Sequence, residues 1–77
     1  MMAGEMWISK RWERDNRYYE AHLKRDLFGW IVARNWGRIG TLYGRRVTSV
    51  VESYDDGLIL LSSIGKTRHS RSYRIRE

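Results

Sequence analysis

The clearest pattern in the chain is an alternation of apolar and polar side chains in residues 17–25. The alternating apolar positions are Tyr19, Ala21 and Leu23. A period of two residues predicts a strand that buries one of its faces. A turn at residues 26–29 leads to a second segment, 30–36, which is rich in strand-forming residues. The two segments predict a β-hairpin in which Arg34 and Trp36 share one face.

Two further segments extend this predicted sheet, and a third forms a weaker candidate. Residues 45–52 follow a turn at residues 41–44 and contain enough β-branched side chains to form a third strand of the meander. Tyr73 and Ile75 alternate with arginines, as a short last strand would. The weaker candidate is a strand in residues 6–13, before the hairpin.

A helix is predicted after Ser53, where the period of the pattern changes. Ser53 offers a hydroxyl for the N-cap, and the Asp56 carboxylate stands three residues further on. Leu58, Leu61 and Ile64 then follow at helical spacing. Two glycines each weaken this helix by roughly 1 kcal/mol relative to alanine. We expect Gly57 to allow a close approach to the sheet and Gly65 to mark where the helix loosens or ends.

These elements predict an α+β fold, a small antiparallel β-sheet with one α-helix packed across it. The chain of 77 residues has room for a single domain, residues 1–77, with residues 1–5 as a flexible N-terminus. It contains no cysteine, so disulfides and thiolate metal sites are excluded, and a reducing cytoplasm is the natural compartment. The longest apolar run, 58–61, is far shorter than the ~20 residues of a membrane span. We therefore expect a cytoplasmic protein without membrane contact or secretion signal.

The charge balance favours a polyanionic partner. Lys and Arg number 15 against nine Asp and Glu, which gives a formal net charge of +6, and most of the cations are arginine. The planar guanidinium binds phosphate through two hydrogen bonds and stacks on flat rings, so this composition favours nucleic acid. Lys66, Arg68 and Arg71 belong to a basic run that could join such a surface. The alternative is that this run forms a solvated edge, which discourages unwanted strand pairing.

The sequence lacks the usual constellations of catalytic groups. Two histidines, His22 and His69, cannot supply the ligands of a structural zinc site without cysteine. Neither a nucleophile elbow nor a phosphate loop is present. We therefore expect no catalytic residue, no metal and no cofactor, and we disfavour an enzyme.

One segment, residues 35–41, concentrates candidate binding chemistry. Trp36 offers a flat stacking face, and Arg38 offers a fork for phosphate beside it. Gly37 and Gly40 lack a Cβ, so they permit tight curvature or the close approach of a sugar-phosphate chain. The alternative is that Trp36 fills the small core and the glycines only shape a bend.

These residues resemble the signature of the WGR domain family, in Trp36-Gly37-Arg38 followed by Ile39-Gly40-Thr41. The resemblance covers residues 17–75. Its other parts are the strand opening Arg17-Tyr18-Tyr19, the acidic helix start Ser53-Tyr54-Asp55-Asp56, and the exit Arg71-Ser72-Tyr73. Two departures are Gly57, where alanine is usual, and Ser72, which replaces the glycine of the exit turn.

The resemblance implies a curved antiparallel sheet with one helix and a role in nucleic-acid binding. In DNA-dependent poly(ADP-ribose) polymerases the signature Trp and Arg contact DNA at a break, and this chain resembles a free-standing bacterial version. By this resemblance Trp36 packs on a sugar or terminal base, and Arg38 binds phosphate or bridges to a partner. Lys66 loosely matches a lysine near the helix end that also touches DNA. The chain has no counterpart of the polymerase catalytic domain, so ADP-ribosylation is not implied.

We therefore expect a non-catalytic nucleic-acid-binding module, for DNA ends or breaks, that contacts phosphate and sugar and reads few bases. The candidate binding residues are Trp36, Gly37, Arg38, Arg34, Lys66, Arg68 and Arg71. The alternative is a protein–protein interaction or dimerisation module that uses exposed aromatic side chains as anchors. The sequence leaves the oligomeric state, the identity of any protein partner and the choice between DNA and RNA open.

Overall fold

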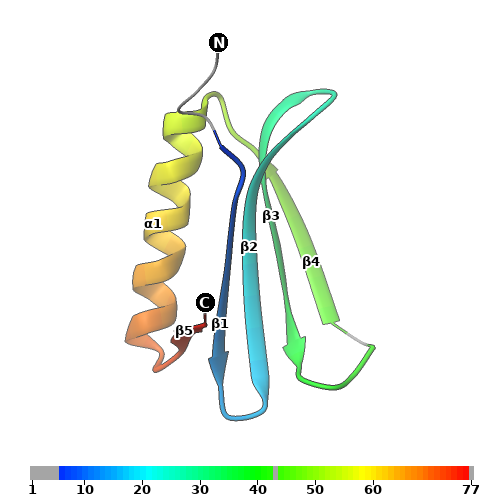
Figure 1. The fold of residues 1–77 in the computed structure, drawn as a ribbon, viewed down its shortest axis with the longest axis vertical. Helices are drawn as coiled ribbons and strands as arrows, with labels where there is room; N and C mark the ends of the chain where they lie inside the picture. The colour runs from blue at the N-terminus through cyan, green and yellow to red at the C-terminus, as the bar shows by residue number, and fades with distance from the viewer. Residues whose placement is uncertain (1–5, 43, 77) are drawn as a thin grey trace.

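The protein forms an antiparallel sheet with one helix packed along it (Figure 1), in a computed structural model that describes residues 6–42 and 44–76. In chain order the elements are β1 (Ile8–Arg14), β2 (Arg17–Asp26), β3 (Gly29–Arg38), β4 (Gly44–Val50), α1 (Tyr54–Ser70) and β5 (Arg74–Arg76). The order across the sheet is β4-β3-β2-β1-β5. The α+β architecture predicted from the sequence is confirmed, including the weaker candidate for the first strand. The N-terminus predicted to be flexible lies outside the described residues.

Turns of two residues set the register of the first three strands. Arg14 pairs with Arg17 across the first turn, and Asp26 pairs with Gly29 across the second. Gly29 has a φ of 118°, a conformation that glycine adopts without the steric cost of a Cβ. Because cross-strand partners lie on the same face of a sheet, this register determines which side chains share a face.

The hydrophobic core lies between one face of the sheet and α1. Its buried members come from β1, β2, β3 and α1, and they are Trp12, Tyr19, Ala21, Leu23, Val32, Leu61 and Ile64. The predicted alternation in residues 17–25 is confirmed, since Tyr19, Ala21 and Leu23 are buried and the residues between them are not. No polar or charged residue in the described part of the chain is buried.

Helix α1 begins where the sequence predicts. Ser53 is the N-cap, and its Oγ accepts a hydrogen bond from the Asp56 amide at 3.1 Å. Gly57, in the first turn, is buried directly against Leu23 of β2, so a Cβ at Gly57 would overlap the Leu23 side chain. The close approach expected at Gly57 is confirmed.

The predicted role of Gly65 is wrong, because α1 continues to Ser70. Gly65 faces Trp12, and an added Cβ would lie 3.6 Å from the Trp12 Cζ2 atom. The helix is stabilised by docking its buried side chains on the sheet, which offsets the roughly 1 kcal/mol that one glycine costs.

The helix ends in a Schellman motif that turns the chain back to the sheet. The Tyr73 N–H donates to the Arg68 carbonyl at 2.9 Å, and the Ser72 N–H donates to the His69 carbonyl at 3.0 Å. Ser72 has a φ of 68°, in the left-handed region where this motif usually places glycine. The reversed chain then forms β5, which pairs with the middle of β1 through Ile75 and Trp12.

Candidate nucleic-acid interface

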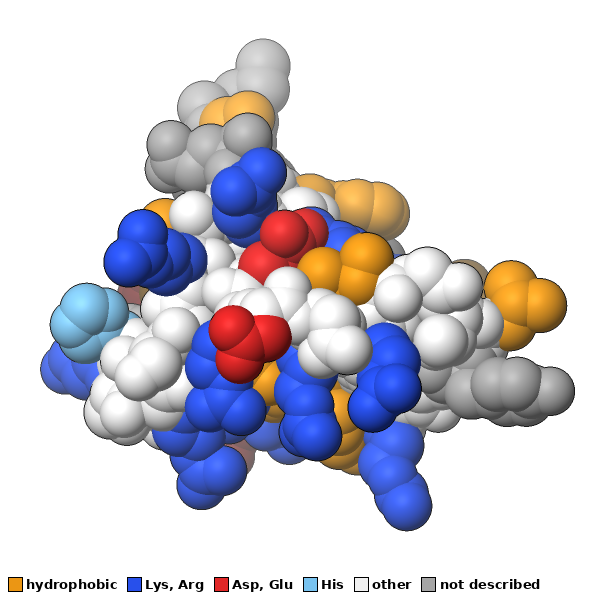
Figure 2. Space-filling model, turned by 90° about the horizontal axis from the view of Figure 1, so that it is seen from below, with side chains coloured by type: hydrophobic (Ala, Val, Ile, Leu, Met, Phe, Trp, Pro, Cys, Tyr) orange, Lys and Arg blue, Asp and Glu red, His pale blue; other side chains and the backbone are white. Residues whose placement is uncertain are grey.

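Five elements meet at one end of the molecule. β1 and β3 end there, β2 and β4 begin there, and α1 reaches it with its last turn (Figure 1). The loop after β3 is tied to the turn between β1 and β2 by a hydrogen bond of 2.7 Å from the Ile39 N–H to the Asn16 carbonyl. Figure 2 views the molecule from this end and shows Lys and Arg side chains spread around it, with few acidic side chains between them. This end therefore presents a predominantly positive surface.

Strand pairing places Trp36 in a row that crosses the sheet at this end. Trp36 pairs with Tyr19 on β2 and with Arg45 on β4. Arg34 lies two residues before Trp36 and pairs with Ala21. Because Tyr19 and Ala21 are buried beneath the helix, this row lies on the helix-facing side of the sheet.

A second row of arginines follows on the same side. Arg38 lies two residues after Trp36 and pairs with Arg17, and Arg17 in turn pairs with Arg14. Arg68 reaches the same surface from the last turn of α1. We refer to this surface as the basic face, which comprises Arg14, Arg17, Arg34, Trp36, Arg38, Arg45 and Arg68.

Trp36 is both packed and partly accessible. Its ring stacks on the Tyr19 ring with the centroids 5.4 Å apart and an angle of 9° between the ring planes. Trp36 is only half-buried, although it packs against the core. The side chain thus packs at the edge of the core and keeps part of its surface accessible.

Aromatic rings position two arginines of the basic face. The Arg68 guanidinium lies 4.1 Å from the centre of the Tyr19 ring and 5.1 Å from that of Tyr73. The Arg14 guanidinium lies 5.3 Å from the Tyr73 ring, and its Nη1 donates to the Arg71 carbonyl at 2.9 Å. Such cation–π contacts restrict the guanidinium groups, so less entropy is lost when they bind an anion.

The arginines of the basic face lack acidic partners. Among the described residues, every ion pair involves Arg11, His22 or Arg76 and none involves a member of this face. The Nε atoms of Arg14, Arg34 and Arg68 are also shielded from solvent without a hydrogen-bond partner. Unsatisfied cationic donors at this density favour a ligand with several anionic oxygens.

On the opposite face of the sheet, Glu13 and Glu20 form ion pairs with basic side chains. Arg11 donates to Glu20 at 2.6 Å and to Glu13 at 2.9 Å, and Asn35 donates to Glu20 at 2.8 Å. Burial raises the pKa of the Glu20 carboxyl, but the hydrogen bonds from Asn35 and Arg11 lower it by more, so its pKa lies below the usual value. Two arginines of the opposite face, Arg11 and Arg76, are thus engaged by acids, whereas no arginine of the basic face forms an ion pair among the described residues.

The structure brings together four of the residues that the sequence singles out, namely Arg34, Trp36, Arg38 and Arg68. Gly37 lies between Trp36 and Arg38 in a regular part of β3, where it pairs with Gly44. A Cβ at Gly44 would lie 2.8 Å from the Trp36 carbonyl oxygen, so a glycine there allows β4 to approach β3 closely. Gly40, with a φ of 84°, forms the bend that the sequence predicts.

Two other candidates lie apart from this group. Lys66 is exposed and lies roughly 200° around α1 from the buried Ile64, on the side that points away from the sheet. Arg71 is the C-cap of the helix, and its carbonyl binds Arg14. The structure thus separates the side chain of Lys66 from the basic face.

Sequence reasoning missed three residues of the basic face, which are Arg14, Arg17 and Arg45, and it missed Tyr73, whose ring supports two of its arginines. Arg17 and Arg45 could have been found from strand alternation once the register with β3 was fixed by the turns. Arg14 and Tyr73 had no such signal, since Tyr73 reaches the site only through the Schellman turn at the end of α1.

These features define a small α+β domain in which a tryptophan packed on the core lies among arginines that form no ion pair with the described residues. The family model described as WGR domain matches residues 5–77, and the chain belongs to the WGR domain family. None of the curated proteins and none of the solved structures compared with the chain matches it significantly. Within the described part of the chain, no helix is long and apolar enough to cross a membrane, and no group of His, Asp and Glu could hold a metal ion.

Proposed function

We propose that this chain is a non-catalytic module that binds DNA at ends or breaks through the basic face. The observation that carries the proposal is a partly accessible tryptophan surrounded by arginines that form no ion pair among the described residues. In poly(ADP-ribose) polymerases the WGR domain is a nucleic-acid-binding module, which supports the same assignment.

In this proposal Trp36 and its neighbours divide the contacts. A terminal base or sugar packs on Trp36, and stacking of this kind is worth ~1–3 kcal/mol per base. Arg38 and its cross-strand partner Arg17 bind the adjacent phosphates, and Arg45 extends the contact on the other side of Trp36. Because α1 is docked on the sheet, no helix is free to enter a DNA groove, so we expect little reading of base sequence.

A titration of the protein with labelled DNA tests this proposal. We expect a duplex with a break to bind more tightly than an unbroken duplex whose two ends are closed by hairpin loops, because only the break then offers a terminal base or sugar to Trp36. Each phosphate neutralised contributes a slope of about −0.9 to the logarithmic salt dependence, so ~4 contacts lower the affinity roughly a hundredfold between about 50 and 200 mM salt. Equal affinity for both duplexes would reject the preference for breaks, and affinity that is flat in salt would reject the electrostatic contact. Single-stranded DNA and RNA, measured in parallel, identify the preferred polymer.

The second candidate is a protein–protein interaction module, and exposed apolar side chains at the other end of the molecule favour it. Leu27 and Phe28 form the turn between β2 and β3 and are 97% and 84% exposed. Trp7 is 64% exposed. Exposed aromatic and apolar side chains of this kind serve as anchors in protein interfaces.

A further inference from the structure

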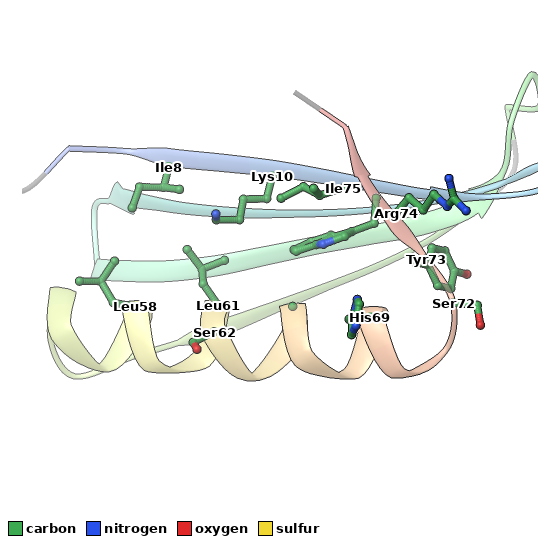
Figure 3. A pocket seen from close by; sticks show the side chains of 12 residues that line it. Ile8, Lys10, Leu58, Leu61, Ser62, His69, Ser72, Tyr73, Arg74 and Ile75 are labelled. Carbon is green, nitrogen blue, oxygen red and sulfur yellow. The ribbon is translucent and has the colours of Figure 1, made fainter.

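A groove lies between α1 and the outer strands of the sheet (Figure 3). It has a volume of about 1040 Å³ and is lined mainly by apolar side chains from β1, α1 and β5. The apolar lining consists of Ile8, Trp12, Leu58, Leu61, Tyr73 and Ile75. Ile75 is 49% exposed and Leu58 is 37% exposed, so apolar surface remains uncovered along the groove.

Basic residues border this groove, and none of its described lining residues is acidic. Lys10, His69 and Arg74 contribute to the lining. Lys10 pairs with the buried Ala21, which places it on the helix-facing side of β1 between the apolar positions of Ile8 and Trp12. A lysine in a row that otherwise faces the core favours a ligand that carries negative charge beside apolar groups.

The backbone edge of β1 is open beside the same groove. β5 pairs only with residues 11–13 of β1, and nothing among the described residues pairs with the outer edge of residues 8–10. Hydrogen-bonded and non-hydrogen-bonded pairs alternate from the Arg14–Arg17 pair that closes the turn. By this alternation Ser9 directs its backbone N–H and C=O away from β2. An open strand edge of this kind accepts a further strand.

We propose that this edge and groove bind an extended acidic segment of a partner protein, which adds to β1 as a strand. Alternate side chains of the bound segment are apolar and enter the groove, and those between them are acidic. The acidic side chains lie on the other side of the sheet near Arg76, whose side chain is 66% exposed and lies 3.7 Å from the Glu13 carboxylate. Lys10 attracts negative charge at the groove itself. A small apolar anion would fill the groove but leave Ser9 unpaired, so the adjacent edge favours a strand.

The opposite edge of the sheet does not offer the same combination. It is formed by β4, whose residues are almost all exposed and include the charged pair Arg45 and Arg46. The hollow that reaches β4 is smaller, at about 310 Å³, and is lined mainly by polar side chains, among them the acidic Glu20. Strand addition is therefore expected at β1 and not at β4.

The test is a titration of the full chain, labelled with ¹⁵N, with a short blocked peptide of alternating glutamate and valine. We expect amide shifts at Ser9, Lys10 and the lining of the groove, and none with the corresponding lysine–valine peptide. Ser9→Pro removes the outward N–H and keeps the hydrogen bonds between β1 and β2, so it should lower the affinity for the peptide by about tenfold or more. Ser9→Ala loses the same hydroxyl but keeps the N–H, so it should bind within about twofold of wild type.

A second pair of variants keeps the proposal testable if Ser9→Pro folds poorly. Lys10→Glu should lower the affinity for the peptide several-fold, whereas Arg46→Glu, with the same change in charge on β4 at the far side of the sheet, should not. Peptide binding that survives both Ser9→Pro and Lys10→Glu would overturn the proposal, as would equal binding of the lysine–valine peptide. Binding of decanoate to the groove without any binding of the acidic peptide would also overturn it, because the groove would then hold a small anion.

Discussion

At the scale of single residues, Trp36 shows why the core and the surface could not be separated by sequence. Its ring is stacked on the buried Tyr19, yet part of it remains accessible. A stacking platform that the core already holds in place loses little side-chain entropy on binding. The packing that stabilises the domain therefore also holds the Trp36 ring in place before any ligand binds.

Trp36→Ala should weaken DNA binding by one to two decades, because the stacking contact is lost. We expect it to destabilise the domain by less than the ~3–5 kcal/mol of a fully buried aromatic deletion, since Trp36 is only half-buried. A thermal melt and a DNA titration measure the two effects. Trp7→Ala, at the other end of the molecule, is the control and should change neither. A folded Trp36→Ala protein that binds as well as wild type would remove Trp36 from the site.

Ser72 is the second residue whose local conformation supports a prediction. Its left-handed φ costs a residue with a Cβ roughly 1–2 kcal/mol, and glycine avoids this cost. Glycine also raises the conformational entropy of the unfolded chain, which offsets part of the gain in stability. Ser72→Gly should therefore stabilise the domain by up to about 1 kcal/mol in a denaturant titration. Ser70→Gly, inside the last turn of α1, should destabilise it instead. A loss of stability in Ser72→Gly would contradict this account of the helix exit.

At the scale of elements, the strands were easier to predict than the end of the helix. Alternation in β2 and the N-cap at Ser53 are local signals, and both were sufficient. The continuation of α1 beyond Gly65 depends on docking against Trp12, which is distant in sequence. Tertiary packing determines where such a helix ends, and local helix propensity does not predict that packing.

The two helix glycines should respond to alanine in opposite directions. Alanine favours a helix by roughly 1 kcal/mol over glycine at either position. At Gly57 the new methyl group would overlap Leu23, which is fully buried, and overpacking of a core costs ~1–3 kcal/mol. At Gly65 the methyl group would only touch Trp12 at 3.6 Å. Thermal melts should show Gly57→Ala below wild type and Gly65→Ala above it, and the reverse order would contradict the packing described for α1.

Sequence patterns placed residues of the basic face together only where they lie on the same strand. Alternation along β3 was enough to place Arg34 on the side of Trp36, and the structure adds Arg38. The arginines on neighbouring strands, such as Arg17 and Arg45, join this side through register, which the sequence pattern does not give by itself. Arg68 was a candidate for its charge alone, and its place over Tyr19 follows from the length of α1.

At the scale of the whole molecule, charge is distributed unevenly along the long axis. The basic face lies at the end where α1 terminates, whereas Asp55 and Asp56 lie in the first turn of α1 at the other end, beside Glu52. Asp26 ends β2 at that same end. Acids at the N-terminus and cations at the C-terminus also complement the dipole of the helix. The resulting field should orient the domain so that the basic face meets a polyanion first.

The measurement that tests the binding face most directly compares Arg45→Glu with Arg46→Glu. Both arginines are exposed neighbours on β4, but Arg45 pairs with Trp36 and Arg46 pairs with Asn35 on the opposite face. The two variants have the same net charge, so any difference in their affinity for a broken DNA duplex reports the face and not the overall field. We predict that Arg45→Glu weakens binding about tenfold or more, and that Arg46→Glu weakens it less than about threefold, with equal thermal stability. Equal loss of affinity in the two variants, or a greater loss in Arg46→Glu, would contradict the assignment of the basic face as the DNA-binding surface.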